Sequence, residues 1–331
     1  KYSVEEFDMQ QRKAYITQFA QHLNMTDKQR SRLHEVIQDQ RTADMYKTPL
    51  HLEIACLLYR EEDPMPTTLT ELYRAIHEYI KEKGKRRMKH KSDDEMEQNF
   101  LRPFYKISFD FYTSGKPHLT EADFTGSPYA SESYVQGGFL TKKALRKRLK
   151  QEQNLSYNHR SFLEFVSALH VQLMSERERQ QWLQGIRIAH NETVVLFLYG
   201  ILQGEALESM VEITMEGMKS AFMDYDSPCS QVHVLFACIN ELGTSTGRID
   251  DLIAEACPQY ITITPDCTNA CQKAVLFICS ISKMESRKIT LEFNMRSKQD
   301  LVPFMKQLRQ CKTIEGVELR HCRSIHQLKV C

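Results

Sequence analysis

The chain has 331 residues, of which 41% are hydrophobic and 26% are charged, and these ordinary globular proportions exclude disordered, collagen-like and coiled-coil classes. With 44 basic and 43 acidic residues the formal net charge is +1, so the whole chain has no strong electrostatic attraction for nucleic acid. No apolar run has the length of a membrane span, and the polar start at Lys1 is unlike a signal peptide. We therefore expect a cytoplasmic protein.

Residues 1–90 are predicted to form a helical domain. Thr26 and Gln29 have the spacing of a capping box, and Pro49 stands where a first helical residue is expected, at the start of PLHLEIACLLY. Proline is common at this position because its missing N–H would have no partner inside the helix. On the residues alone, Pro49 therefore needs no role beyond starting a helix.

Residues 91–172 are predicted to be helices followed by two short strands and a closing helix, which is the order of a winged-helix domain. We place one strand directly after Gly138 and the other at residues 155–157, with the basic stretch TKKALRKRLK between them. Winged helices often bind DNA, so a nucleic-acid-binding protein is one alternative. Nucleic acid is not the expected partner, because the helix before the strands lacks a set of residues for reading base edges. The candidate contacts of this alternative are Lys142, Lys143, Arg146, Lys147, Arg148 and Lys150.

The segment LSYNHRSFLEFVSAL, residues 155–169, changes from strand periodicity to helix periodicity at His159. The free amides and the positive end of a helix favour an anion, and a histidine there can add a hydrogen-bond donor. His159 is therefore a candidate phosphate contact. The alternative is that it only caps the helix or fills a turn.

Residues 173–257 are predicted to be helical again. Residues 258–331 then carry an internal repeat, in which an apolar–polar–apolar triplet recurs every 28 residues, at 261, 289 and 317. Helical stretches separate the triplets, and one strand plus one helix per repeat of this length is typical of leucine-rich repeats. The predicted fold class is therefore mainly α, with a helical domain, a winged-helix domain, a second helical domain and then α/β leucine-rich repeats.

Three phrases and the repeat that follows them, in this order, resemble the NACHT-domain NOD-like receptors, a family of STAND ATPases. PLHLEIACLLY resembles their first helical domain, YNHRSFLEF the end of their winged helix, and FLYGIL their second helical domain, with leucine-rich repeats following. The resemblance implies ADP or ATP as the cofactor. It also implies that Pro49 packs on the adenine base and that His159 contacts the β-phosphate of ADP.

The function implied by the resemblance is a switch of innate immunity that is autoinhibited at rest. It would sense a protein or microbial ligand at the repeats and then oligomerise. The 331 residues contain no Gly-x-x-x-x-Gly-Lys-Ser/Thr loop, so we expect an upstream nucleotide-binding core of the same protein to supply the phosphate loop and the magnesium site. The chain itself is not expected to be an enzyme, and no catalytic or metal-ligating residue is predicted. A second alternative is a leucine-rich-repeat binding scaffold without a working nucleotide switch.

Overall fold

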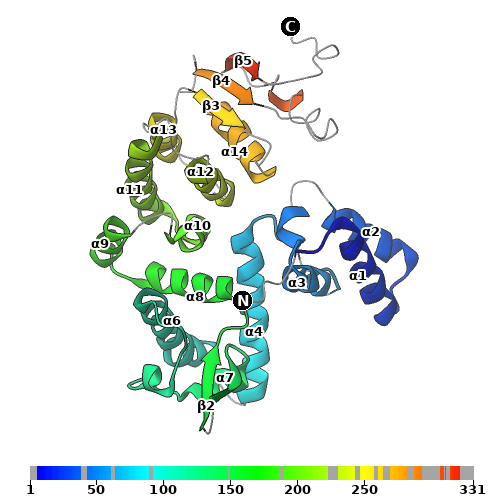
Figure 1. Ribbon diagram of the computed structural model, residues 1–331, viewed down its shortest axis with the longest axis vertical. Coiled ribbons are helices and arrows are strands. Elements are labelled where there is room, and N and C mark those ends of the chain that lie inside the picture. Colours follow the sequence, from blue (N-terminus) through cyan, green and yellow to red (C-terminus); the bar gives the residue numbers. More distant parts are fainter. Residues whose placement is uncertain are drawn as a thin grey trace. The chain divides into compact units, whose positions relative to one another are not determined.

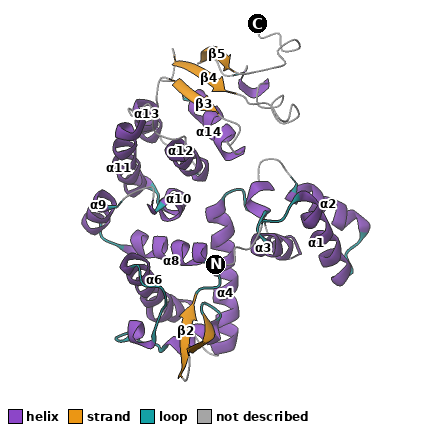
Figure 2. Ribbon diagram, in the orientation of Figure 1, coloured by secondary structure: helices purple, strands orange, loops and turns teal. Residues whose placement is uncertain are grey.

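Helices make up most of the described part of the chain, as the computed structural model in Figure 2 shows, and the prediction of a mainly α protein is confirmed. Within this part, no helix is both long enough and apolar enough to cross a membrane.

The chain divides into two compact units, Lys1–Gln181 with Asn191–Leu202, and Trp182–His190 with Gln203–Cys331. The described residues are 6–38, 43–60, 64–88, 92–147, 150–186, 190–222, 230–242, 247–256, 260–263, 269–281, 287–292, 306–308, 310 and 314–320.

The first unit begins with a group of helices whose starts follow from their capping residues. Thr26 and Gln29 cap each other's backbone N–H groups at 2.9 and 3.3 Å, so the predicted capping box is confirmed. Pro49 is the first residue of its helix, also as predicted. These elements are α1 (Met9–His22), α2 (Asp27–Ile37), the 3-10 helix η1 (Ala43–Tyr46), α3 (Pro49–Arg60) and α4 (Leu69–Met88).

A second group of helices in the first unit precedes and follows a two-stranded antiparallel hairpin in the chain. The predicted strand limits were wrong, because the basic stretch that we placed between the strands itself forms strand β1 (Thr141–Lys147), which pairs with β2 (Lys150–Ser156). The helices before and after it in the chain are α5 (Asp93–Glu95), η2 (Met96–Leu101), α6 (Arg102–Ser114), η3 (Glu121–Phe124), α7 (Ser131–Gly137) and α8 (Arg160–Leu173).

Helix α8 is central to the first unit and packs against α4, α6 and α10 (Glu192–Ile201) (Figure 1). Of the apolar stripe predicted for it, Phe162, Phe165 and Val166 are at most 3% exposed, whereas Leu169 is only partly buried. Burial of side chains this large stabilises a helix by roughly 2 kcal/mol each. The packing therefore fixes where the first turn of α8 begins. Helix α9 (Glu176–Gly185) follows α8 along the chain.

The second unit contains a helical part and a three-stranded parallel sheet. The triplets predicted as strands lie in β3 (Tyr260–Ile263), β4 (Arg287–Glu292) and β5 (Ile314–Arg320). Ile261 pairs with Ile289 and Ile289 with Val317, so the strands follow the repeat of the sequence. The helices of this unit include α11 (Gly204–Phe222), α12 (Ser230–Glu241), α13 (Gly247–Ala256) and α14 (Asn269–Ser280).

Candidate functional site

His159 is the N-cap residue of α8, as the cap alternative predicts. Its backbone is extended, and its ring Nδ1 accepts a hydrogen bond from the Ser161 N–H at 3.2 Å. Because Nδ1 accepts, the proton of the neutral ring is on Nε2, which is then a donor. The cap does not use this donor. The ring is partly exposed, and among the described residues Nε2 has no hydrogen-bond partner.

Pro49 begins the first turn of α3 and is partly exposed. The preceding Thr48 acts as the cap, since its hydroxyl accepts from the N–H of His51 at 3.3 Å and its carbonyl accepts from the N–H of Leu52 at 3.0 Å. These two bonds satisfy part of the polar end of the helix. The ring of Pro49 is thus held on a capped and well-defined helical turn.

The position of His51 shows that the two predicted site residues, Pro49 and His159, lie in one region of the first unit. It lies on the first turn of α3, directly after Pro49 and Leu50, and its ring centroid is 6.2 Å from that of His159. Only 7% of His51 is exposed. Its two ring nitrogens are both hydrogen-bonded, Nδ1 with the Met45 carbonyl at 2.9 Å and Nε2 with the Tyr73 hydroxyl at 2.8 Å. The start of α3 therefore lies beside the start of α8.

The directions of the two hydrogen bonds of His51 follow from the Met45 carbonyl. Met45 offers a carbonyl, which only accepts, so Nδ1 of the neutral His51 ring carries the proton and Nε2 is the acceptor. Tyr73 therefore donates to Nε2. Burial raises the pKa of the Tyr73 hydroxyl to about 12, and the smaller effect of the Ser161 side chain opposes this rise. A directed chain of hydrogen bonds thus runs from Tyr73 on α4 through His51 on α3 to the Met45 carbonyl.

Buried aromatic rings hold Tyr73 in place. The Tyr73 ring lies 5.1 Å from that of Phe197 and 5.9 Å from that of Phe165, and these two phenylalanine rings are 5.2 Å apart. All three side chains are at most 1% exposed. Interiors packed in this way leave a ring little freedom to move, so the Tyr73 hydroxyl has a fixed position.

The start of α8 can bind an anion. The Nε2 donor of His159 and the positive end of the helix dipole both favour negative charge, whereas the Ser161 and Phe162 N–H groups already donate to His159 itself. Arg160 adds a mostly exposed guanidinium, although Glu164 compensates part of its charge through an ion pair at 3.0 Å. In the described part of the chain, no three His, Cys, Asp or Glu side chains gather to hold a metal ion.

Sequence reasoning missed three members of this region, namely His51, Tyr73 and Ser161. His51 could have been found, because it is a polar residue among the apolar positions of PLHLEIACLLY and therefore had to find partners if buried. Nothing in the sequence distinguishes Tyr73 from the core positions of its helix. Its hydroxyl became informative once its bond to His51 on another helix was known.

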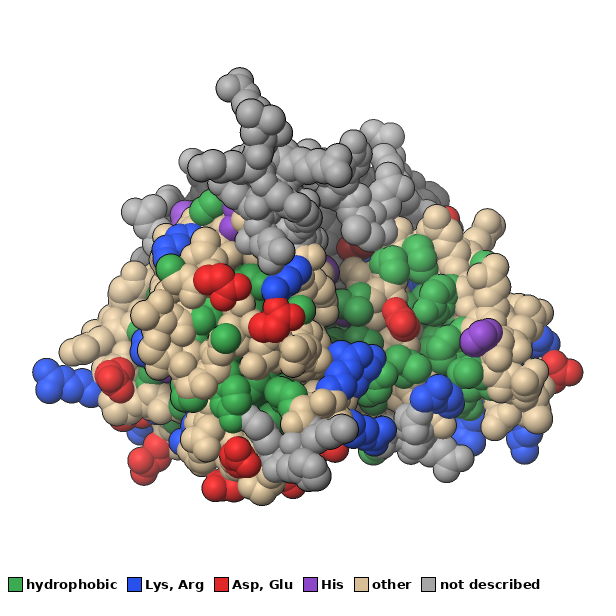
Figure 3. Space-filling model, turned by 90° about the horizontal axis from the view of Figure 1, so that it is seen from below, with side chains coloured by type: hydrophobic (Ala, Val, Ile, Leu, Met, Phe, Trp, Pro, Cys, Tyr) green, Lys and Arg blue, Asp and Glu red, His purple; other side chains and the backbone are tan. Residues whose placement is uncertain are grey.

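The basic residues of the nucleic-acid alternative are only partly described. Lys142 forms an ion pair with Glu132 of α7, so its charge is compensated locally. The side chains of the other five candidates lie outside the described residues. On the face shown in Figure 3, acidic and basic side chains are both scattered over the surface.

No protein-family model matches the sequence, and no match is found among curated proteins.

Acid is expected to destabilise the first unit through His51. Burial lowers the pKa of His51 below its ordinary 6.5, against a smaller opposite effect of the Met45 carbonyl, and the nearby His159 lowers it further. The unfolded chain then binds this proton more readily than the folded chain, so stability is constant above about pH 6.5 and falls as the pH drops below it. We expect the thermal unfolding midpoint to decrease between about pH 7 and pH 5.5.

The matched variant for this prediction is His51→Gln, which keeps an acceptor for Tyr73 but does not titrate. It should lose less stability over the same pH interval. Glu78 does not add to the loss of stability in this pH interval. A hydrogen bond with His77 lowers the pKa of Glu78 to about 2, so the stability that its ionised form contributes is lost only as the pH falls below the ordinary 4.5. Equal losses in the two proteins would show that His51 does not set the sensitivity to acid.

Proposed function

We propose that this chain is the regulatory part of a cytosolic NOD-like receptor, a switch that ADP and ATP control. The observation that carries the proposal is the approach of the first turn of α3 to the N-cap of α8, with 6.2 Å between the ring centroids of His51 and His159. Pro49 and His159, the residues expected to contact the adenine and the β-phosphate, lie on these two turns. A nucleotide held by both would connect the two helices.

The order of the elements supports the same proposal. We interpret α1–α4 as the first helical domain, α5–α8 with the β1–β2 hairpin as the winged helix, and α9–α13 as the second helical domain. Strands β3, β4 and β5 with α14 would then be the first leucine-rich repeats, because a parallel strand recurs every 28 residues (261 to 289 to 317). Such repeats provide extended surfaces for a protein or microbial ligand.

The upstream nucleotide-binding core is the partner that the switch requires. Leu50, Ile54 and Leu57 of α3 are only partly buried, whereas the opposite face with His51 and Leu52 is covered. We propose that the core packs on this half-exposed apolar face at rest and supplies the phosphate loop and the magnesium site. Nucleotide exchange, or a ligand at the repeats, would release the contact and permit oligomerisation in an innate immune signal.

The proposal is tested by the nucleotide content of the full-length protein. Purified protein, with folding verified by circular dichroism, is denatured and the released nucleotide is identified by chromatography. We expect close to one ADP per chain, because the donors at the start of α8 and the core together would hold the nucleotide through purification. An empty site in folded protein would contradict the switch and favour the repeat scaffold.

A further inference from the structure

The chain segment that leads into His159 is anchored by one buried tyrosine. Tyr157 lies two residues before His159, and its hydroxyl bonds to the Ser108 hydroxyl on α6 at 2.7 Å. We infer that Tyr157 is a positioning residue for the phosphate contact, because its bond to α6 sets the place at which the segment brings His159 to the start of α8. The inference rests on the proposed function and deepens it.

The bond between Tyr157 and Ser108 has a fixed direction. The Ser108 Oγ lies 2.7 Å from the Phe104 carbonyl, which only accepts, so the Ser108 hydroxyl donates to this carbonyl. The Ser108 oxygen is then the acceptor for the Tyr157 O–H. Ser108 is 0% exposed and Tyr157 is 9% exposed, so water does not readily replace either partner. A directed chain of hydrogen bonds therefore runs from Tyr157 into the backbone of α6.

Aromatic contacts keep the Tyr157 ring against the same helix. Its centroid lies 5.9 Å from that of Phe104 and 6.2 Å from that of Phe111, and both phenylalanines belong to α6. Packed rings of this kind have little freedom to move, so the Tyr157 hydroxyl has a defined position. The ring contacts do not depend on the hydroxyl. A variant can therefore remove the hydrogen bond and leave the ring packing in place.

Only one residue, Asn158, separates this anchor from the N-cap of α8. Asn158 is exposed. On the other side of the N-cap, the His159 ring accepts from the Ser161 N–H at 3.2 Å, and the His159 carbonyl accepts from the Phe162 N–H at 3.1 Å. The position of His159 is therefore set by the first turn of α8 on one side and by Tyr157 on the other. Tyr157 acts on His159 through the backbone of two adjacent peptide units.

Two single substitutions and their combination break the link in different ways. Tyr157→Phe leaves Ser108 bonded to Phe104, so little stability should be lost. Ser108→Ala leaves the Tyr157 hydroxyl buried without an acceptor, which is more costly. The double variant removes both polar groups, so it should be more stable than Ser108→Ala alone.

All three variants should release ADP from the full-length protein about fivefold faster than the parent, because a neutral hydrogen bond shifts an equilibrium by roughly this factor. The double variant separates positioning from stability. Its unfolding midpoint should recover relative to Ser108→Ala, whereas its release of ADP should stay fast because the link is still absent. A tyrosine that only stabilised the fold would give a release rate that recovers together with the midpoint.

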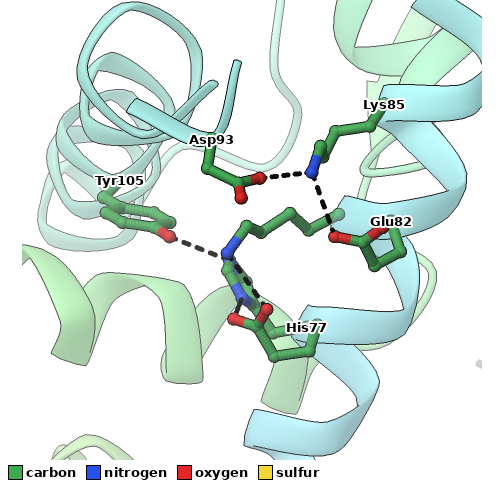
Figure 4. Close-up of polar contacts among 7 residues, drawn as sticks. His77, Glu82, Lys85, Asp93 and Tyr105 are labelled. Carbon is green, nitrogen blue, oxygen red and sulfur yellow. Dashed lines mark hydrogen bonds and ion pairs between the residues drawn. The ribbon is translucent and has the colours of Figure 1, made fainter. Parts of the chain in front are cut away.

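Tyr105→Phe is the matched control on the same helix. Tyr105 is also buried, and its hydroxyl bonds to Nε2 of His77 on α4 at 2.9 Å (Figure 4). Within the described residues, no hydrogen bond or ring contact joins Tyr105 to Tyr157 or to His159. This variant should lose thermal stability, because His77 loses its buried partner, and should release ADP at the rate of the parent protein.

The measurements are the release of radiolabelled ADP into excess unlabelled ADP, the thermal unfolding midpoint, and the hydrogen exchange of the first turn of α8. Support requires faster release and faster exchange in all three link variants, and in Tyr105→Phe neither. Release at the rate of the parent in Tyr157→Phe, or release that follows the midpoints across the series, would overturn the inference while the parent still holds ADP. If the folded parent holds no ADP, the proposed function has failed and the inference fails with it.

Discussion

Gly200→Ala is expected to loosen α10 from α4 in the first unit. A Cβ atom at Gly200 would lie 2.3 Å from the Thr70 Oγ1, 2.6 Å from its Cβ and 2.8 Å from its Cγ2, closer than real contacts allow. Thr70 is 1% exposed and cannot turn into solvent. Overpacking costs about 1–3 kcal/mol, although alanine regains part of this through its helix propensity. We expect roughly tenfold faster hydrogen exchange of the α4 and α10 amides.

The control for this prediction is Gly185→Ala at the end of α9, where an added Cβ meets no atom within 4 Å. Exchange in this variant should match the parent. Thr70→Ala removes two of the three obstructing atoms, so combining it with Gly200→Ala should restore part of the protection. Unchanged exchange in Gly200→Ala would mean that the backbone of α10 adjusts at little cost.

Local signals predicted the helices well and the hairpin poorly. The cap at Thr26 and the helix start at Pro49 depend on residues within a few positions of each other, which sequence spacing reveals. The hairpin limits depend on pairing between Thr141 and Ser156 and along the strands, and the basic composition of β1 hid its strand character. Propensity for strand is more dependent on context than propensity for helix.

The candidate site, too, could be predicted from the sequence only in part. The change of periodicity at residue 159 predicted a histidine at the start of a helix, and the structure has it as the N-cap. The approach of His51 to His159 could not be predicted, because it depends on how α3, α4 and α8 pack together. The same packing gave the Tyr73 hydroxyl on α4 its buried partner, His51 on α3.

His159→Ala is expected to release ADP from the full-length protein and to shift it toward the oligomer. A hydrogen bond to a charged group contributes about 1.5–3 kcal/mol, so its loss should speed release by about tenfold to a hundredfold. A resting state that this bond helps to hold would be depopulated by a similar factor. Release is measured with radiolabelled ADP, and oligomers are measured by size-exclusion chromatography with light scattering.

Alanine also removes the cap of α8, which costs about 1 kcal/mol, so two further variants separate the two roles of His159. Asparagine places an acceptor near the position of Nδ1, so the Ser161 N–H keeps its capping hydrogen bond. It has no group at the position of Nε2. Glutamine places an amide donor near Nε2 and is a poor cap. If His159 contacts phosphate, His159→Gln should retain ADP longer than His159→Asn. The reverse order would show that the histidine serves only to cap the helix.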